Sequence, residues 1–434
     1  MRGVAMAGRP AGQAGIDWPI WWTTFLSLTG YNIAVGISPV LTAMFLLCWS
    51  LYFLAWPTRN LDRLLLAPLP FALPLFALAS TLWSQATAVT LRNAIELLLV
   101  TGIGVLIARA QRLRGFLSAF MCMMLVSVVV GAATGRRAAV GVHGDMALIG
   151  IFGSKNYFAL MISMMMLSAA AVLADMWQPR LLRLLGLFGL VIGPPLLVMA
   201  KSLGAMLTLF LALGCLGLFA LAGRLSHRLR PALYILAALL VLAMVATFLL
   251  LQDSGVFEML LRSAGKDTSL TGRTFLWSRA DGLIPLHPLL GVGYQAFWVQ
   301  ESVEAEGLWR FSDIISRFGF HFHNLYYETA IELGYVGVVI LGTTLAAVTV
   351  AALIAVIRRP CPEHAFLVSA TAIFLSRAYV ELDFLSPFSI GSLLLPIFWS
   401  YGVQAVAETR RLGRRPVWQA DMRPGEQPMP IPAR

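Results

Sequence analysis

Residues 320–339 read FHFHNLYYETAIELGYVGVV, and they mark the point where a long polar loop gives way to an apolar helix. The alternating aromatic residues and histidines of 320–323 indicate extended backbone. Asn324 is a favoured helix N-cap, and the residues after it follow helical spacing. His323 is therefore predicted at the amino-terminal end of a helix. Free backbone N–H groups and the helix dipole favour an anion there, such as a phosphate.

The composition places most of the chain in a membrane. Hydrophobic residues make up 59% of the 434 residues, charged residues only 12%, and the mean hydropathy is +0.79. Soluble domains carry about twice that share of charge. We therefore predict an all-α polytopic membrane protein with about 12 transmembrane helices, each near the length that spans the bilayer. The expected spans are 17–31, 36–56, 64–83, 91–108, 116–134, 155–174, 181–200, 202–222, 231–251, 333–357, 364–382 and 388–406.

The positions of the basic residues predict the orientation. If the amino terminus is cytoplasmic, 20 of the 32 Lys and Arg residues fall in the cytoplasmic loops and the two terminal segments. This alternation supports twelve spans with both termini in the cytoplasm. It also explains most of the net charge of +11, so nucleic-acid binding is a poor explanation for that charge.

Four regions are expected along the chain. Residues 1–251 hold the first nine spans, 252–325 form one large periplasmic loop of short helices, 326–406 hold the last three spans, and 407–434 form a disordered cytoplasmic tail rich in Arg and Pro. The first apolar segment lacks a small-residue cleavage site and is interpreted as a retained anchor. The four cysteines indicate neither a disulfide framework nor a metal site.

Of the twelve Lys and Arg residues outside the cytoplasmic pattern, three lie at predicted membrane edges: Lys155, Lys201 and Arg377. A cation near the bilayer centre costs about 2.5–3.5 kcal/mol. Each of them alone is equally well explained by a side chain that reaches back to the interface. Together with the long loop, they suggest a cationic cavity at the outer face that binds a phosphorylated lipid or glycan.

Several of these residues have structural alternatives. Asn156 or Ser154 can simply cap the sixth span, and Lys201 lies in a tight hairpin that can either pack closely or turn its cation toward the outer cavity. Arg377 and Glu381 are spaced to pair across one helical turn.

The long loop contains two further motifs, Thr271–Trp277 and His287–Gly293. Glycine and proline punctuation between tryptophans indicates short helices on the bilayer surface. The tryptophans can form an interfacial belt, which is their commoner use, or stack on pyranose rings.

These motifs, together with His323-Asn324, Gly334 and Gly337, resemble those of the O-antigen ligase and polysaccharide polymerase superfamily. The resemblance implies a glycosyltransferase of the bacterial inner membrane with its active site on the periplasmic face and with no metal ion or other cofactor. The donor would be an oligosaccharide linked to undecaprenyl diphosphate. The acceptor would be lipid A-core for a ligase, or a second lipid-linked repeat for a polymerase. Membrane lipids and a chain-length regulator are the other expected partners.

The resemblance also assigns roles to residues. His323 corresponds to the histidine that positions or deprotonates the acceptor hydroxyl, and Arg273 to an arginine that neutralises the diphosphate. The candidate substrate contacts are Lys155, Asn156, Lys201, His321, Asn324, Tyr327 and Arg377. Ligases tend to carry an arginine after the serine of the hairpin, where this chain has Leu203. That departure favours a polymerase, with a ligase as the alternative.

Two other functions compete with a glycosyltransferase. A flippase for the same lipid-linked glycan would use the cationic cavity as a passage. The absence of evident internal repeats and the concentration of polar residues in one loop disfavour it. A scaffolding role would leave the outward-facing cations without a purpose, so we rank it last.

Overall fold

The computed structural model describes residues 15–140, 144–251, 272–300, 302–317 and 319–413. Helices dominate this part of the chain, and only one short hairpin, β1 (Arg137–Val140) with β2 (Asp145–Leu148), interrupts them. The predicted all-α membrane fold is confirmed. The helices before the long loop are α1 (Trp18–Ile33), α2 (Pro39–Ala55), α3 (Pro57–Leu65), α4 (Ala72–Ala79), α5 (Thr87–Ala110), α6 (Leu113–Ala133), α7 (Lys155–Ala174), α8 (Arg180–Met199), α9 (Leu203–Arg224) and α10 (Arg230–Leu251).

The remaining helices are α12 (Arg273–Leu283), α13 (Val303–Phe311), α14 (Leu325–Arg358), α15 (Pro362–Arg377) and α16 (Ile390–Gly413). Short 3₁₀ turns, η1 (Ala34–Gly36), η2 (Leu69–Phe71), η3 (Ser80–Leu82), η4 (Gly150–Phe152) and η5 (Ile284–Leu286), join several of them. Helix α16 continues to Gly413, into the segment expected to be a disordered tail. Residues 414–434 of that tail and residues 252–271 of the long loop lie outside the described residues.

The predicted count of twelve spans is not confirmed. Among the described residues, seven helices are long and apolar enough to cross a membrane, and an eighth is added if α2 and α3, which meet at a bend of 106°, form one span. Helices α1 and α15 have only 16 residues each, or about 24 Å at 1.5 Å per residue. The segment expected at 64–83 is divided into η2, α4 and η3 by a run that contains Pro68, Pro70 and Pro74.

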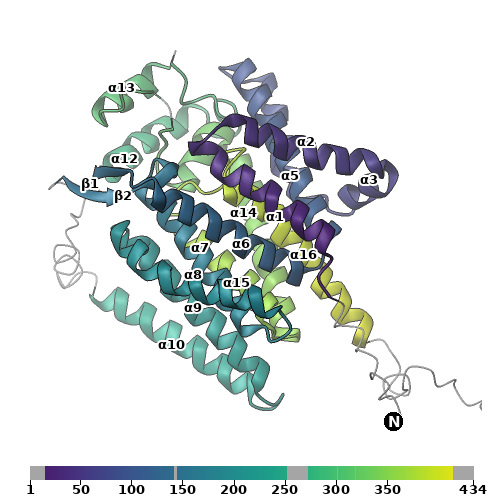
Figure 1. Ribbon diagram of the computed structural model, residues 1–434. Coiled ribbons are helices and arrows are strands. Elements are labelled where there is room, and N and C mark those ends of the chain that lie inside the picture. Colours follow the sequence, from purple (N-terminus) through teal and green to yellow (C-terminus); the bar gives the residue numbers. More distant parts are fainter. Residues whose placement is uncertain (1–14, 141–143, 252–271, 301, 318, 414–434) are drawn as a thin grey trace, which may run out of the picture.

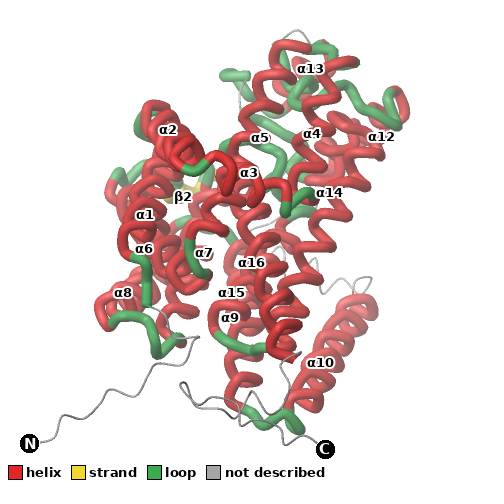
Figure 2. The backbone as a smooth tube through the Cα atoms, turned by 90° about the vertical axis from the view of Figure 1, so that its right-hand side faces the viewer, coloured by secondary structure: helices red, strands yellow, loops and turns green. Residues whose placement is uncertain are grey.

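Helices α6 and α7 form the centre of the bundle (Figure 1). Their side chains are mostly buried, whereas α8 and α9 expose large apolar residues on their outer faces, as expected for surfaces that meet lipid. Gly193 lets α8 approach α7 closely, because a Cβ atom there would lie 2.5 Å from the Met166 sulfur. Helix α10 lies at the edge of the bundle (Figure 2), and its first residue Arg230 donates through Nε to the Ala222 carbonyl (3.0 Å).

The described part of the long loop forms a small helical unit, residues 272–324, which we call the helical loop. Figures 1 and 2 show its helices α12 and α13 together at one end of the bundle. The helical loop and the first turns of α14 share an apolar core that is separate from the core of the bundle. This shared core includes Trp277, Trp309 and Phe322 from the helical loop and Ile331 from α14. The prediction of short helices in this loop is therefore confirmed.

A break in α14 anchors the helical loop to the bundle. Gly334 has φ 65° and ψ −171°, a conformation that only glycine adopts readily, and a Cβ atom there would lie 2.2 Å from the Leu289 carbonyl. The loop at 288–293 forms backbone hydrogen bonds with α14 on both sides of the break at Gly334. The Tyr335 N–H donates to the Pro288 carbonyl (2.8 Å), and the Gly293 N–H donates to the Glu332 carbonyl (2.9 Å). The break therefore holds the first turns of α14 against the helical loop.

Candidate functional site

Glu381, in the segment between α15 and α16, lies at the centre of a cluster of polar side chains. One carboxylate oxygen, Oε1, accepts from an Arg273 guanidinium nitrogen (2.7 Å) and from Asn156 Nδ2 (2.7 Å). The other, Oε2, lies 3.6 Å from His323 Nδ1. The side chains of Glu381 and Arg273 are only 12% and 15% exposed. Four distant segments of the sequence therefore meet at one largely buried carboxylate.

Arg273 and Asn156 both lie at helix amino-terminal ends, each just after a left-handed glycine. Gly272 has φ +85° immediately before α12, and Gly153 has φ +70° shortly before α7. The Ser202 hydroxyl donates to Asn156 Oδ1 (3.1 Å), which leaves the amide nitrogen of Asn156 directed at Glu381. The hairpin between α8 and α9 thus contributes to the site through Ser202.

The predicted helix start after His323 is confirmed. Asn324 Oδ1 accepts from the backbone N–H groups of Tyr326 and Tyr327 (2.9 and 3.2 Å), as an N-cap should. Its Nδ2 donates to the Tyr379 carbonyl (3.0 Å), and the Leu325 N–H donates to the Ala378 carbonyl (2.8 Å). These bonds hold the start of α14 against the segment that carries Glu381.

His323 itself has φ +53°, in the left-handed region, which costs a non-glycine residue about 1–2 kcal/mol. Its backbone N–H donates to His321 Nδ1 (3.0 Å), and the two imidazole centroids are 4.2 Å apart. Strain of this kind is common where a side chain must point in one direction for function. The His321 ring therefore acts first as a support for the His323 backbone.

Trp277 and Glu328, which are not among the predicted site residues, hold the peptide next to His323. The Trp277 indole N–H donates to the Phe322 carbonyl (2.9 Å). The buried Glu328 carboxylate accepts from the Phe322 N–H (2.8 Å) and from the Trp298 indole N–H (2.8 Å). Both backbone polar groups of Phe322 are thus paired, which fixes the residue before the strained histidine.

The charges of the cluster follow from its surroundings. Burial alone would raise the pKa of Glu381, but the neighbouring His323, Arg377 and Arg273 together lower that pKa below its usual range. Burial, with smaller contributions from His323 and Arg273, lowers the pKa of His321 to about 3 against the opposing effect of Glu381. Glu381 is therefore an anion and His321 a neutral imidazole at neutral pH.

Arg377 is placed differently from the prediction. Helix α15 ends at Arg377, and the Glu381 N–H still donates to the Arg377 carbonyl (2.8 Å), but the two side chains do not form the expected ion pair. Arg377 instead makes a buried bidentate contact with Asp383 (2.7 and 3.0 Å). Arg92 and Glu96, four residues apart on α5, form an ion pair with 3.0 Å between Nε and Oε1.

The remaining candidates surround the cluster. Lys201 Nζ lies 3.3 Å from Asp145 Oδ1 in β2, and the lysine side chain is 42% exposed. Lys155 is the first residue of α7, next to Asn156. Tyr327 lies in the first turn of α14, with its ring stacked on Trp277 at 6.1 Å. The structure thus brings Asn156, Arg273, His321, His323 and Asn324 together, and it places Lys201 at the neighbouring β-hairpin.

Comparison with known proteins decides the family. A family model described as O-antigen ligase matches residues 188–342, a range that contains both Arg273 and His323. The chain is also 31% identical over 361 residues to the exopolysaccharide production protein ExoQ of Rhizobium meliloti (strain 1021), covering 82% of this chain and 80% of that protein.

The chain belongs to the O-antigen ligase and polysaccharide polymerase family. The resemblance seen in the sequence is therefore confirmed. Membership in this family, together with the apolar helices, supports a multi-pass membrane enzyme of the ligase and polymerase class.

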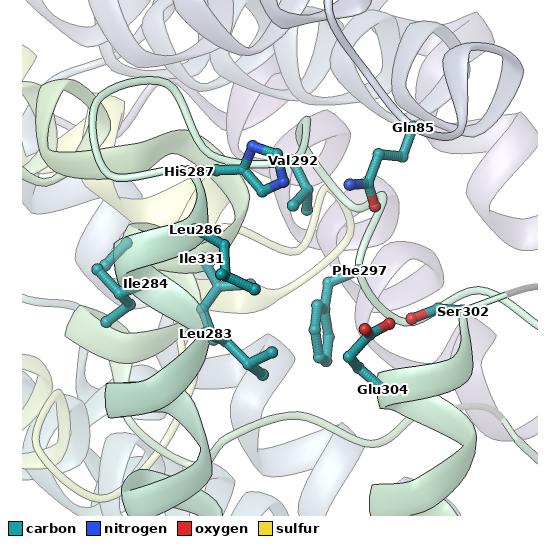
Figure 3. Close-up of a pocket in the computed structure, with 11 residues that line it drawn as sticks. Gln85, Leu283, Ile284, Leu286, His287, Val292, Phe297, Ser302, Glu304 and Ile331 are labelled. Atoms are coloured by element: carbon teal, nitrogen blue, oxygen red, sulfur yellow. The ribbon is translucent and has the colours of Figure 1, made fainter.

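A cavity of about 70 Å³ lies away from the cluster around Glu381 (Figure 3). It lies between the helical loop and the first turns of α14, and its polar lining comes from Gln85, His287, Ser302 and Glu304. None of its lining residues belongs to the cluster around Glu381. The cavity is also smaller than the roughly 300 Å³ of typical ligand pockets. It is therefore not the candidate site.

A metal ion is the one cofactor for which the cluster has suitable donors. Ligand atoms of His321, His323 and Glu381 lie within 4.8 Å of one another. The Arg273 guanidinium, however, already lies 2.7 Å from the Glu381 carboxylate. A divalent cation at the same carboxylate would be repelled by that fixed positive charge. The three side chains are therefore better suited to holding the Arg273 guanidinium than to binding a metal ion.

Proposed function

We propose that this family member transfers an oligosaccharide from undecaprenyl diphosphate to a glycan acceptor on the periplasmic face of the inner membrane. The observation that carries the proposal is the contact of one buried carboxylate, Glu381, with both Arg273 and His323. One of these side chains can take a proton, and the other can stabilise a phosphate. A glycosyl transfer from a diphosphate needs both.

The chemistry follows from these roles. The acceptor hydroxyl oxygen forms a bond to the anomeric carbon, and the bond between that carbon and the diphosphate oxygen breaks. His323 takes the hydroxyl proton, and Glu381 stabilises the imidazolium that forms, because it stays ionised and lies 3.6 Å away. Distances of this kind often shorten when substrate binds.

Arg273 stabilises the leaving diphosphate. A guanidinium has five N–H donors, and the Glu381 contact involves only one of its nitrogens, so other donors can face a phosphate. Lys155 and Lys201 are the further cations proposed for the diphosphate. Because these side chains supply the positive charge, we propose that the transfer needs no metal ion. Full activity after exhaustive treatment with a chelator is the expected result, and loss of activity that Mg²⁺ or Mn²⁺ restores would contradict it.

A polymerase is the favoured reaction. The relative that covers 82% of this chain is described as an exopolysaccharide production protein, and Leu203 stands where ligases tend to carry an arginine. The acceptor is then a second lipid-linked repeat, and a chain-length regulator is an expected partner. For a ligase, the acceptor would be lipid A-core.

A deletion strain distinguishes these reactions. Loss of long polymer with accumulation of single lipid-linked repeats on the outer face supports a polymerase. Full-length polymer on undecaprenyl diphosphate together with bare lipid A-core supports a ligase. Accumulation of repeats on the inner face would overturn the enzyme proposal in favour of a flippase.

The base role is tested by His323→Gln in the complemented deletion strain. We expect polymer to disappear while the amount of protein in the membrane stays the same. The matched control is His227→Gln, because His227 is exposed and lies between α9 and α10, outside the cluster. Polymer at the wild-type level in the His323 variant would rule out the base role.

A further inference from the structure

A continuous strip of aromatic side chains begins beside His323. We call it the tyrosine strip, and its members are Trp277, Tyr326, Tyr327, Tyr335 and Tyr379. The Trp277 centroid lies 5.2 Å from that of Tyr379 and 6.1 Å from that of Tyr327, which in turn lies 5.3 Å from Tyr326. The Tyr335 side chain lies beside that of Tyr326, close enough for their hydroxyl groups to interact. The five rings therefore form one connected surface.

The strip is attached to the proposed active site at two points. Trp277 lies one helical turn after Arg273 on α12, and its indole N–H bonds to the carbonyl just before His323. The Tyr379 carbonyl accepts from Asn324, just after His323, and Tyr379 lies two residues before Glu381. A ligand lying on the tyrosine strip would thus have one end at the His323 imidazole.

The strip has both an apolar and a polar edge. Tyr379, Tyr326 and Tyr335 are 65%, 46% and 44% exposed, so their rings are accessible. The exposed Asp281 carboxylate lies near the Tyr327 side chain, at the border of the strip. Flat aromatic faces with a carboxylate beside them suit a pyranose ring, which has apolar C–H faces and hydroxyl donors around its edge.

We propose that the tyrosine strip is the subsite for a pyranose ring of the acceptor glycan, an inference that rests on the glycosyl transfer proposed above. The donor has a diphosphate, which Arg273 anchors through charge. The reacting sugar of the acceptor has no phosphate beside its own reacting hydroxyl, even when a lipid diphosphate is attached further along the acceptor, so stacking and hydroxyl contacts must align it. The tyrosine strip provides stacking and hydroxyl contacts next to His323, the side chain that takes the acceptor's proton.

The alternative occupant is the lipid headgroup region, where tyrosines are common. An interfacial belt needs exposed rings but no order among them and no carboxylate. In the strip, Trp277 is fixed by its bond to the peptide next to His323, Tyr327 stacks on Trp277, and Asp281 lies beside Tyr327. This order favours a saccharide over lipid.

The test uses the purified full-length chain in lipid nanodiscs, with the donor and with short saccharides released from the host's polymer by partial acid hydrolysis. Tyr379→Ala removes the most exposed ring. We expect about a tenfold rise in KM for the acceptor, the effect of losing one ring face of apolar contact. The donor KM and kcat should change much less. Tyr379→Phe keeps the ring and should recover most of the lost affinity.

The control is Trp56→Ala, because Trp56 is a similarly exposed aromatic (52%) at the bend between α2 and α3. It should leave the acceptor KM unchanged. An equal rise in acceptor KM for the Trp56 and Tyr379 variants would assign the strip to the lipid interface and overturn the proposal, as would an unchanged acceptor KM in Tyr379→Ala.

Direct binding separates this inference from the proposed function. Saturation-transfer NMR with the same saccharides should show binding to the wild type and to His323→Gln, and weaker binding to Tyr379→Ala. If the wild type binds the saccharide through Tyr379 but transfers nothing from the donor, the result supports the acceptor subsite and contradicts the proposed glycosyl transfer. If transfer occurs and saccharide binding does not depend on Tyr379, the result supports the glycosyl transfer and contradicts the acceptor subsite.

Discussion

At the scale of single residues, the carboxylate of Glu381 determines how the site works. Its negative charge lies 2.7 Å from the Arg273 guanidinium and 3.6 Å from the imidazole of His323. The same anion thus orients a cation for the leaving group and stabilises the protonated base. Neutralising it should therefore damage the chemical step more than the fold.

Glu381→Gln keeps the size of the side chain and an acceptor oxygen but removes the charge. We expect kcat to fall by about 100-fold or more, in the range of lost acid–base catalysis, with a smaller change in KM. Initial rates with purified protein check this, and Glu304→Gln on α13 is the matched control because Glu304 is exposed and outside the cluster. A kcat within threefold of the wild type would remove Glu381 from the mechanism.

His321 makes the stability of the protein depend on pH. Its pKa is about 3 in the folded chain and 6.5 as its ordinary value. Between these values the unfolded chain binds more protons than the folded one, so the free energy of unfolding rises with pH and falls on acidification below about 6.5. His321→Asn keeps an acceptor for the His323 N–H but cannot be protonated.

The thermal unfolding midpoint, measured by intrinsic fluorescence between pH 5 and pH 7.5, tests this. The midpoint of the wild type should drop toward pH 5, and the drop should be smaller in the His321→Asn variant. Identical pH dependence in the two proteins would show that His321 does not carry the effect.

At the scale of elements, the broken helix α14 positions His323. The start of α14 keeps its place because the chain at Gly334 leaves the helical path and meets the loop at 288–293. This loop contains the second motif singled out in the sequence. Its glycines have a geometric role: a Cβ atom at Gly291 would lie 2.4 Å from the Glu332 carbonyl.

Gly334→Ala should therefore destabilise the protein. The backbone conformation alone costs an alanine about 1–3 kcal/mol, and the new Cβ atom would collide with the Leu289 carbonyl. The matched control, Gly342→Ala in the same helix, has open space around its Cβ atom and should be neutral or slightly stabilising. Thermal midpoints in nanodiscs compare the two, and an equal effect of both substitutions would contradict the role of the break.

Local patterns predicted part of the site and missed the rest. The N-cap at Asn324 follows from a few adjacent residues, as do the short helices of the long loop, and both are confirmed. Glu381 was interpreted as a helical partner of Arg377, because four-residue spacing is the only pattern visible in sequence. Its actual partners Arg273 and Asn156 are 108 and 225 residues away. Contacts of this length depend on tertiary packing, which local spacing does not encode.

At the scale of the whole molecule, hydropathy predicted the fold class but not the number of spans. Apolar segments such as 64–83 are long enough in sequence to cross a bilayer, but prolines break this one into pieces. The arginines predict that the helical loop and the turn between α9 and α10 lie on opposite sides of the membrane.

Labelling tests this orientation. In a variant without the four native cysteines, Val303→Cys on α13 should react with a membrane-impermeant maleimide in intact spheroplasts, since Val303 is 80% exposed. Ser226→Cys, in the exposed turn after α9, should react only after permeabilisation. The reverse pattern would invert the proposed topology.

The order of the cluster's residues along the chain has a consequence for biosynthesis. The ribosome makes Arg273 and His323 well before Glu381, and the start of α14 is tied to the carbonyls of Ala378 and Tyr379. A growing or prematurely terminated chain that lacks the segment after α15 cannot assemble the cluster. Assembly of the cluster therefore has to await synthesis of the segment after α15.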